Sequence, residues 1–149
     1  MDILIVEDSE AEARLLLEVF AEVNKDARLH VVSDGVEAMA FLRYQGCYLD
    51  APRPNLILLD LGMPKMNGIE VLASVRGDPW LRTIPVIVLT SSQAEEDVAQ
   101  CYKLMASCYL SKPPEFRELK QLVNSLNDFW LTRVKFHKHS RDANKALTE

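Results

Sequence analysis

Cysteine is scarce in this sequence, and its spacing fits no metal site. The chain has three cysteines, Cys47, Cys101 and Cys108, an odd number. We expect buried or half-buried thiols in a reducing cytoplasm. Long apolar runs are missing too, since none reaches the ~18 residues of a membrane span. The first apolar run starts almost at Met1, so we expect no signal peptide and a cytoplasmic protein.

Positive charge and glycine are also in short supply. The net charge is −5, from 17 Lys and Arg against 22 Asp and Glu, which gives no field to attract nucleic acid or an anionic membrane. We therefore expect neither as a partner. No glycine-rich loop follows the first apolar run, because residues 7–10 read Glu-Asp-Ser-Glu. That absence argues against a nucleotide or flavin site.

Short apolar runs alternate with amphipathic helical patterns five times along the chain. Runs this short, uninterrupted by polar residues, are typical of strands buried on both faces. The alternation predicts a parallel sheet with helices on both faces and right-handed crossovers. We predict a flavodoxin-like, doubly wound (βα)5 fold of α/β class with strand order 2-1-3-4-5. The expected strands are residues 3–6, 29–32, 56–59, 86–89 and 108–110.

The chain shows no internal repeat and no second domain. We predict one domain over residues 1–134 and a tail over 135–149, either mobile or an extension of the last helix. In the second helical pattern, Val36, Met39, Ala40 and Leu42 are the expected buried positions. The last pattern runs as one helix from Phe116 to Trp130.

Polar residues follow four of the expected strands where each strand ends. Glu7 and Asp8 follow the first, Asp60 the third, Thr90 the fourth and Lys112 the fifth. Because the carboxyl ends of parallel strands share one edge of a sheet, these side chains should meet there. The sequence thus predicts a shallow pocket with three carboxylates, a hydroxyl and an ammonium.

The chemistry of such a pocket favours phosphoryl transfer. Clustered carboxylates repel unless one is protonated or a cation binds, and oxygen ligands without imidazole or thiolate select Mg²⁺ or a similar ion. A carboxylate can act as a nucleophile and form an aspartyl phosphate. Phosphoryl transfer mainly needs positioning and charge neutralisation. Histidine and cysteine are absent from this edge, which argues against a hydrolase triad.

Four motifs in register resemble the receiver domain of two-component response regulators. They are Glu7-Asp8, the segment DLGMPKMNG at 60–68, Thr90 and Lys112-Pro113. The resemblance covers about residues 1–130. The segments YQGCYLDAPRPNLILLD, DPWLRTIPVIVLTSS and LNDFWL are similar to the small response regulators that partner cyanobacterial bacteriophytochrome kinases.

The resemblance implies a role for each site residue. Asp60 would accept a phosphoryl group from the phosphohistidine of a histidine kinase. Asp8 and Asp60 would bind Mg²⁺ (or Mn²⁺) through carboxylates, Glu7 through water and Gly62 through its carbonyl. The residues that would hold phosphoryl oxygens are Thr90 and Lys112.

It also implies a switch and a special peptide bond. Thr90 and Tyr109 would move together, with Tyr109 swinging inward. Lys112–Pro113 would be a cis peptide. Two positions depart from the family pattern: Gly62 lacks the longer polar side chain often found there, which leaves the rate of dephosphorylation open, and Pro114 would stiffen entry into the last helix.

The implied function is a single-domain phosphoacceptor switch, not a metabolic enzyme, that catalyses only its own phosphorylation and dephosphorylation. No output domain is expected after residue 134, so the signal would pass through a partner surface. The expected partners are a sensor histidine kinase of the phytochrome type and a second copy bound through the fourth helix, fifth strand and fifth helix.

Other interpretations stay open at this point. The chain could be a receiver-like interaction module that is never phosphorylated. An aspartyl-phosphate hydrolase would need a second acid–base Asp where Gly62 stands. Thr90 could simply cap the fourth helix, Tyr109 could be a static core residue, and His137 with His139 could bind metal.

Overall fold

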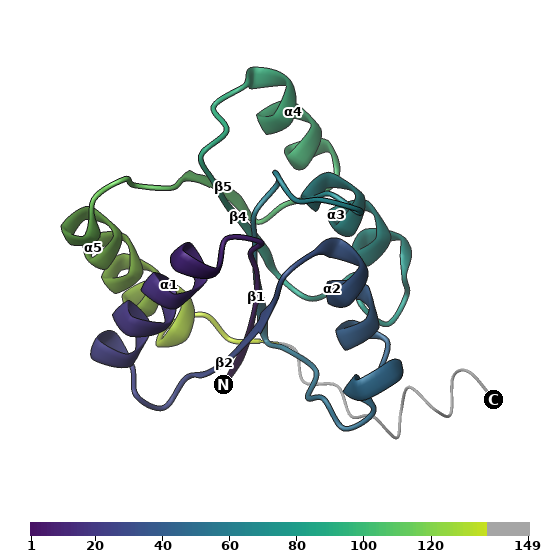
Figure 1. The fold of residues 1–149 in the computed structure, drawn as a ribbon, viewed down its shortest axis with the longest axis horizontal. Helices are drawn as coiled ribbons and strands as arrows, with labels where there is room; N and C mark the ends of the chain where they lie inside the picture. The colour runs from purple at the N-terminus through teal and green to yellow at the C-terminus, as the bar shows by residue number, and fades with distance from the viewer. Residues whose placement is uncertain (137–149) are drawn as a thin grey trace.

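The protein is an α/β sandwich built on one parallel sheet. A computed structural model describes residues 1–136, and Figure 1 shows the sheet in the middle of two helical layers. The five strands lie in the order β2-β1-β3-β4-β5, all pairs parallel, which confirms the predicted flavodoxin-like order 2-1-3-4-5. The strands are β1 Asp2–Val6, β2 Arg28–Val32, β3 Leu56–Leu59, β4 Val86–Thr90 and β5 Cys108–Ser111.

The helices connect these strands and divide into two layers. They are α1 Glu10–Val23, α2 Gly35–Leu42, α3 Gly68–Gly77, α4 Glu95–Lys103 and α5 Phe116–Leu126. In Figure 1, α1 and α5 lie on one face of the sheet and α2, α3 and α4 on the other. The short 3₁₀ turn η1 covers Gly46–Tyr48, and the π-helical turn η2 covers Asn127–Leu131.

Each face of the sheet has its own apolar core. One core packs α1 and α5 against side chains such as Ile5 and Leu58, and the other packs α2, α3 and α4 against side chains such as Leu4 and Leu59. Every residue of β1, β3 and β4 is buried. Burial on both faces explains why these strands read as continuous apolar runs rather than as alternating patterns.

Side-chain caps fix where three helices begin. Ser9 Oγ accepts a hydrogen bond from Glu12 N, and Asp34 caps α2 in the same way through Glu37 N. At α3, Asn67 and Glu70 form a reciprocal capping box. The capped helices follow β1, β2 and β3, and because these strands are parallel, all three caps lie at the same edge of the sheet.

Three expectations about local structure are wrong. Val36 is 52% exposed rather than buried, because α2 already begins at Gly35 and Val36 lies in its first, outward-facing turn. The last helix is not α-helical to Trp130, since it ends at Leu126 and widens into η2. Cys47 is exposed in η1, whereas Cys101 is buried and Cys108 partly buried.

None of the helices within residues 1–136 is long and apolar enough to cross a membrane. The predicted tail begins at residue 135, so all but its first two residues lie outside the described part of the chain. His137 and His139 lie there as well.

Candidate functional site

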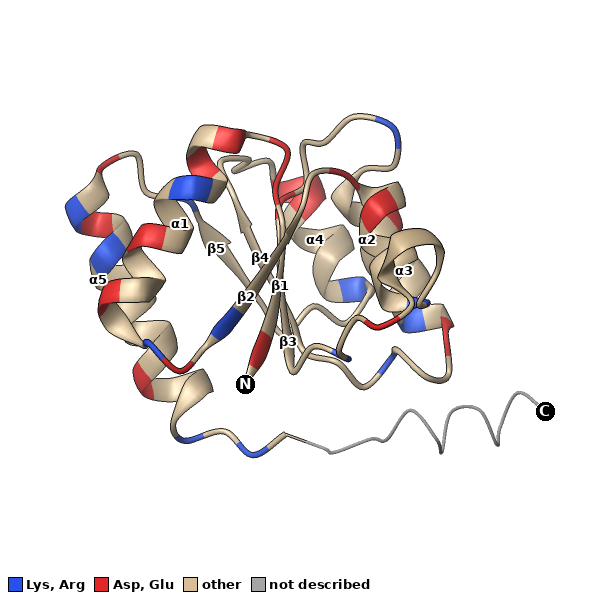
Figure 2. Cartoon of the chain, turned by 60° about the horizontal axis from the view of Figure 1, so that its bottom comes forward, with Lys and Arg blue, Asp and Glu red and all other residues tan. Residues whose placement is uncertain are grey.

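The site lies at the carboxyl ends of β1, β3 and β5. Glu7 N donates to Val32 O at 3.0 Å and Asp60 N donates to Val6 O at 3.0 Å, so both residues extend the sheet ladder one step beyond their strands. The ladder therefore fixes where these two acidic side chains start. Figure 2 shows acidic residues gathered where β1 passes into α1, at the upper end of the sheet.

Three carboxylates meet at this edge. Glu7, Asp8 and Asp60 each offer an oxygen, and these oxygens all lie within 4.8 Å of one another. Glu7 and Asp60 are buried, with 3% and 8% of their surface exposed, while Asp8 is open to solvent. The structure thus brings together the three acidic residues that the sequence placed on one edge.

Lys112 supplies the positive charge. Its Nζ donates to Glu7 Oε2 at 2.6 Å, to Glu12 Oε2 at 3.0 Å and to Asp60 Oδ2 at 3.5 Å. Only 9% of the Lys112 side chain is exposed. A buried ammonium shared among carboxylates offsets part of their repulsion, but one positive charge cannot neutralise them all.

The protonation of this cluster reflects its burial. Burial raises the pKa of Glu7 to about 7, against hydrogen bonds from Lys112 and from Ser9 N that lower it. Burial alone would lower the pKa of Lys112, but hydrogen bonds to Glu7 and Glu12 outweigh it and raise that pKa. Lys112 therefore stays charged at neutral pH.

The donor set fits a hard divalent cation. All three candidate ligands are carboxylates, within reach of one another, and one of them opens to solvent. Oxygen-only donors of this kind suit Mg²⁺, Mn²⁺ or Ca²⁺ better than softer metals. Gly62, the fourth predicted ligand, lies in the exposed loop after Asp60, and its carbonyl remains a predicted ligand.

Two backbone N–H groups, those of Leu61 and Gly68, fix the position of Asp60 and of the residue that follows it. Leu61 N donates to Asp60 Oδ1 at 2.8 Å, which orients the carboxylate, and Gly68 N donates to Leu61 O at 3.1 Å. A Cβ on Gly68 would press against Asp60 O and lie 2.7 Å from Leu61 Cα. The loop can close over Asp60 only because residue 68 has no side chain.

Thr90 and Tyr109 are joined through the loop after β4. Thr90 is 2% exposed, and its Oγ1 accepts a hydrogen bond from Ser92 N at 3.4 Å. The half-buried Tyr109 donates from its hydroxyl to Ser92 O at 2.9 Å. Both predicted switch residues therefore contact the same loop residue. Thr90 does not cap α4, because the N-cap of that helix is Ala94.

The predicted cis bond between Lys112 and Pro113 is wrong. No peptide bond within residues 1–136 is cis. Lys112 N donates a hydrogen bond to Thr90 O at 2.8 Å, so the end of β5 still pairs with β4 although the Lys112–Pro113 bond is trans. Trans is the lower-energy form even before proline, by roughly 0.5–1 kcal/mol.

Sequence reasoning missed Glu12. In the sequence Glu12 lies off the apolar face of the helical pattern, like other polar residues of α1, yet its carboxylate contacts Lys112, which is 100 positions away along the chain. The only local signal is the spacing from Ser9 to Glu12, which is typical of a capping box. Nothing in that spacing points to a lysine in another element.

Comparison with known proteins gives consistent matches. A family model described as the response regulator receiver domain matches residues 3–124. The chain is 48% identical over 132 residues to response regulator Rcp1 of Synechocystis sp., covering 89% of this chain and 90% of Rcp1. The Mn²⁺-bound structure of Rcp1 matches with 47% identity and a TM-score of 0.86, over 92% of this chain and 99% of that chain. Phosphorylated RcpA, a cyanobacterial phytochrome response regulator, matches with 42% identity and a TM-score of 0.88, over 92% and 98% of the two chains.

Proposed function

Because the chain belongs to the family of response regulator receiver domains, we propose that it is a switch that accepts a phosphoryl group on Asp60. The observation that carries this proposal is the placement of Asp60 among Glu7, Asp8 and Lys112 at one edge of the sheet. The chain spans 90% of Rcp1, which is itself a response regulator, and this coverage supports the same kind of role. The phosphorylated state of RcpA adds support from a relative.

The geometry of the site supports a direct transfer to Asp60. One oxygen of the Asp60 carboxylate attacks the phosphorus of a phosphohistidine on the kinase. An O–P bond forms as the P–N bond breaks, and the leaving imidazole takes up a proton from solvent. Lys112 Nζ, already 3.5 Å from Asp60 Oδ2, can pair with a phosphoryl oxygen, and Thr90 can donate its hydroxyl to another.

A divalent cation held by Asp8, Asp60 and Glu7, with the Gly62 carbonyl, would neutralise negative charge on the transferred group. We propose Mg²⁺ for this role, with Mn²⁺ as a substitute. The buried carboxylates support the proposal, because Lys112 alone leaves net negative charge at the edge. The catalysis is confined to the protein's own phosphorylation and dephosphorylation.

The phosphoacceptor role is tested with a small phosphoryl donor. The parent and Asp60→Asn are incubated with acetyl phosphate and Mg²⁺, and the intact mass is measured. We expect the parent to gain one phosphoryl group and Asp60→Asn to gain none. An equal gain in both, or no gain in the parent, would refute the proposal. An interaction module that is never phosphorylated would give the second result.

The proposed partner is a phytochrome-type sensor histidine kinase in the cytoplasm. The support comes from relatives, since RcpA is a phytochrome response regulator and RtBRR, 36% identical, is a bacteriophytochrome response regulator. The net charge of −5 argues against nucleic acid as a partner.

Output through the α4–β5–α5 face, including a homodimer, is also proposed. The exposed side chains of Tyr102, Met105 and Phe116 on or beside these elements support it. Tyr109 links the face to the loop that follows Thr90. Sedimentation of the parent with and without acetyl phosphate measures this association, and a monomer in both conditions would contradict it.

A further inference from the structure

Two helices begin with the same cap pattern but use it differently. At α3, Asn67 accepts from Glu70 N, and the Glu70 side chain accepts from Asn67 N, which completes the capping box. At α1, Ser9 Oγ accepts from Glu12 N at 3.3 Å, but Ser9 N donates to Glu7 Oε1 at 3.0 Å instead. Glu7 has taken over the role that Glu12 would have in the box.

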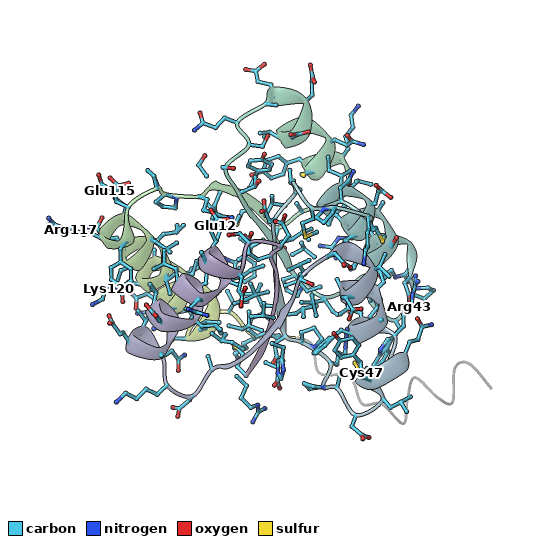
Figure 3. All side chains as sticks on the ribbon, viewed as in Figure 1. Glu12, Arg43, Cys47, Glu115, Arg117 and Lys120 are labelled. Atoms are coloured by element: carbon cyan, nitrogen blue, oxygen red, sulfur yellow. The ribbon has the colours of Figure 1, made fainter. Side chains whose placement is uncertain are left out.

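The carboxylate of Glu12 is directed to Lys112 instead. Its Oε2 lies 3.0 Å from Lys112 Nζ, and it joins α1 to the end of β5. Figure 3 shows Glu12 at the start of α1, near the end of the sheet where the chain passes from β5 to α5. The contact is therefore a bridge between two elements and not a local helix cap.

The three carboxylates around Lys112 differ in their access to water. The side chain of Glu7 is 2% exposed and that of Asp60 11%, whereas that of Glu12 is 46% exposed. A buried carboxylate that loses its partner keeps an uncompensated charge, which is strongly destabilising. A half-exposed carboxylate can instead be hydrated. Glu12 is thus the partner that Lys112 can release at the lowest cost.

Phosphorylation changes what Lys112 must contact. It adds roughly −1.5 to −2 charge and three acceptor oxygens beside the ammonium. The ammonium has three N–H donors. In the present arrangement Glu7, Glu12 and Asp60 use all three of them. The donor now directed at Asp60 Oδ2, 3.5 Å away, can pass to the phosphoryl group when Asp60 is esterified. A second contact from Lys112 to the phosphoryl group requires Glu7 or Glu12 to release the ammonium.

We propose that Glu12 is a positioning residue that shares Lys112 before phosphorylation and releases it to the phosphoryl group. The contact stabilises the unphosphorylated state and so opposes phosphorylation. This inference rests on the proposed role of Asp60 as phosphoacceptor. It assigns to α1 a direct influence on the lysine that follows β5.

The test compares Glu12→Gln with Glu10→Gln. Glu10 lies in the same first turn of α1, but its side chain is 95% exposed and forms only a long ion pair of 4.0 Å with Arg14. The control therefore removes the same charge from α1 without removing a contact to Lys112. With acetyl phosphate and Mg²⁺, we expect Glu12→Gln to be phosphorylated about two- to fivefold faster than the parent, as loss of a partly exposed ion pair allows. Glu10→Gln should match the parent.

A second variant separates contact from charge. Glu12→Asp keeps the charge but shortens the side chain by one methylene, so it should lose the contact and resemble Glu12→Gln. The affinity for beryllofluoride, a stable mimic of the phosphoryl group, gives an equilibrium measurement, and we expect about two- to fivefold tighter binding in both Glu12 variants.

Several results would overturn the inference. The first is a phosphorylation rate of Glu12→Gln that equals or falls below that of the parent. The second is an equal increase of this rate in Glu10→Gln. The third is a Glu12→Asp variant with the phosphorylation rate of the parent. All of them leave the parent phosphorylated on Asp60. Failure of the proposed function looks different, because there the parent itself gains no phosphoryl group.

Discussion

Gly68 shows how one missing side chain can set the position of a reactive carboxylate. Its Cα packs onto the peptide that joins Asp60 to Leu61, where any Cβ would overlap backbone atoms. Backbone cannot rotate away as a flexible side chain can, so a substitution must shift the loop or the start of α3. The cost would therefore fall on stability and on the orientation of Asp60 together.

Gly68→Ala should lower the free energy of unfolding by about 1–3 kcal/mol, the range found for overpacked sites. Denaturant unfolding measures the change. Gly77→Ala is the matched control, because Gly77 ends the same helix and a Cβ there would meet nothing within 4 Å. The control should be neutral or stabilising, by up to about 1 kcal/mol. Equal destabilisation of both variants would argue against steric overlap at Gly68.

At the scale of elements, the edge strand β2 is fastened to β1 at the end of the sheet away from the acidic cluster. Asp2 faces Arg28 across the strand pair, and Arg28 Nε and Nη2 each donate to the Asp2 carboxylate at 2.9 Å. His30 Nε2 lies 3.0 Å from the same carboxylate. The hydrogen bond from Arg28 is the main cause that lowers the pKa of Asp2 from 3.8 to about 2, against burial, which raises it.

This fastening predicts a pH dependence of stability. A depressed folded-state pKa means that the contribution of Asp2 is fully present above its unfolded value of 3.8 and disappears as the pH falls through about 2. Because Arg28 is largely exposed, we expect Asp2→Asn to lose about 1–2 kcal/mol near neutral pH. Unfolding at several pH values should show the difference from the parent shrinking below pH 3.8. Asp26→Asn, which removes an exposed carboxylate, is the control and should match the stability of the parent near neutral pH to within about 0.5 kcal/mol.

The elements that could be predicted from the sequence are those marked by a recurring hydrophobic pattern. Apolar runs marked all five strands, and the sheet edge followed from their order. Val36 was misplaced because an apolar residue in the first turn of a helix can face either way, and the cap at Asp34 decides its direction. The contact of Glu12 could not be predicted because its partner, Lys112, lies 100 positions away in the sequence. No local sequence pattern indicates a contact between residues so far apart.

At the scale of the whole molecule, the carboxylate cluster places repulsion at one end of an otherwise apolar sandwich. Binding of a cation to the folded state alone should relieve it and raise stability. Mg²⁺ at about a hundred times its dissociation constant should add about 2.7 kcal/mol to the free energy of unfolding. Chemical unfolding with Mg²⁺ or with a chelator measures the difference.

Asp8→Asn is the informative variant for the cation, because Asp8 is the exposed member of the cluster. Without Mg²⁺ this variant should be at least as stable as the parent, since it removes a like charge. With Mg²⁺ it should gain much less than the parent. The same gain in both proteins would place the bound cation elsewhere.

The three thiols differ in a way that has a practical consequence. Cys101 is buried and Cys108 partly so, and burial raises the pKa of both, whereas Cys47 stands exposed on a surface turn. Figure 3 shows Cys47 below α2, away from the upper end of the sheet. A maleimide dye should therefore attach at one position of the native sequence. Such a label would give single-molecule experiments a fluorescent handle without any engineered cysteine.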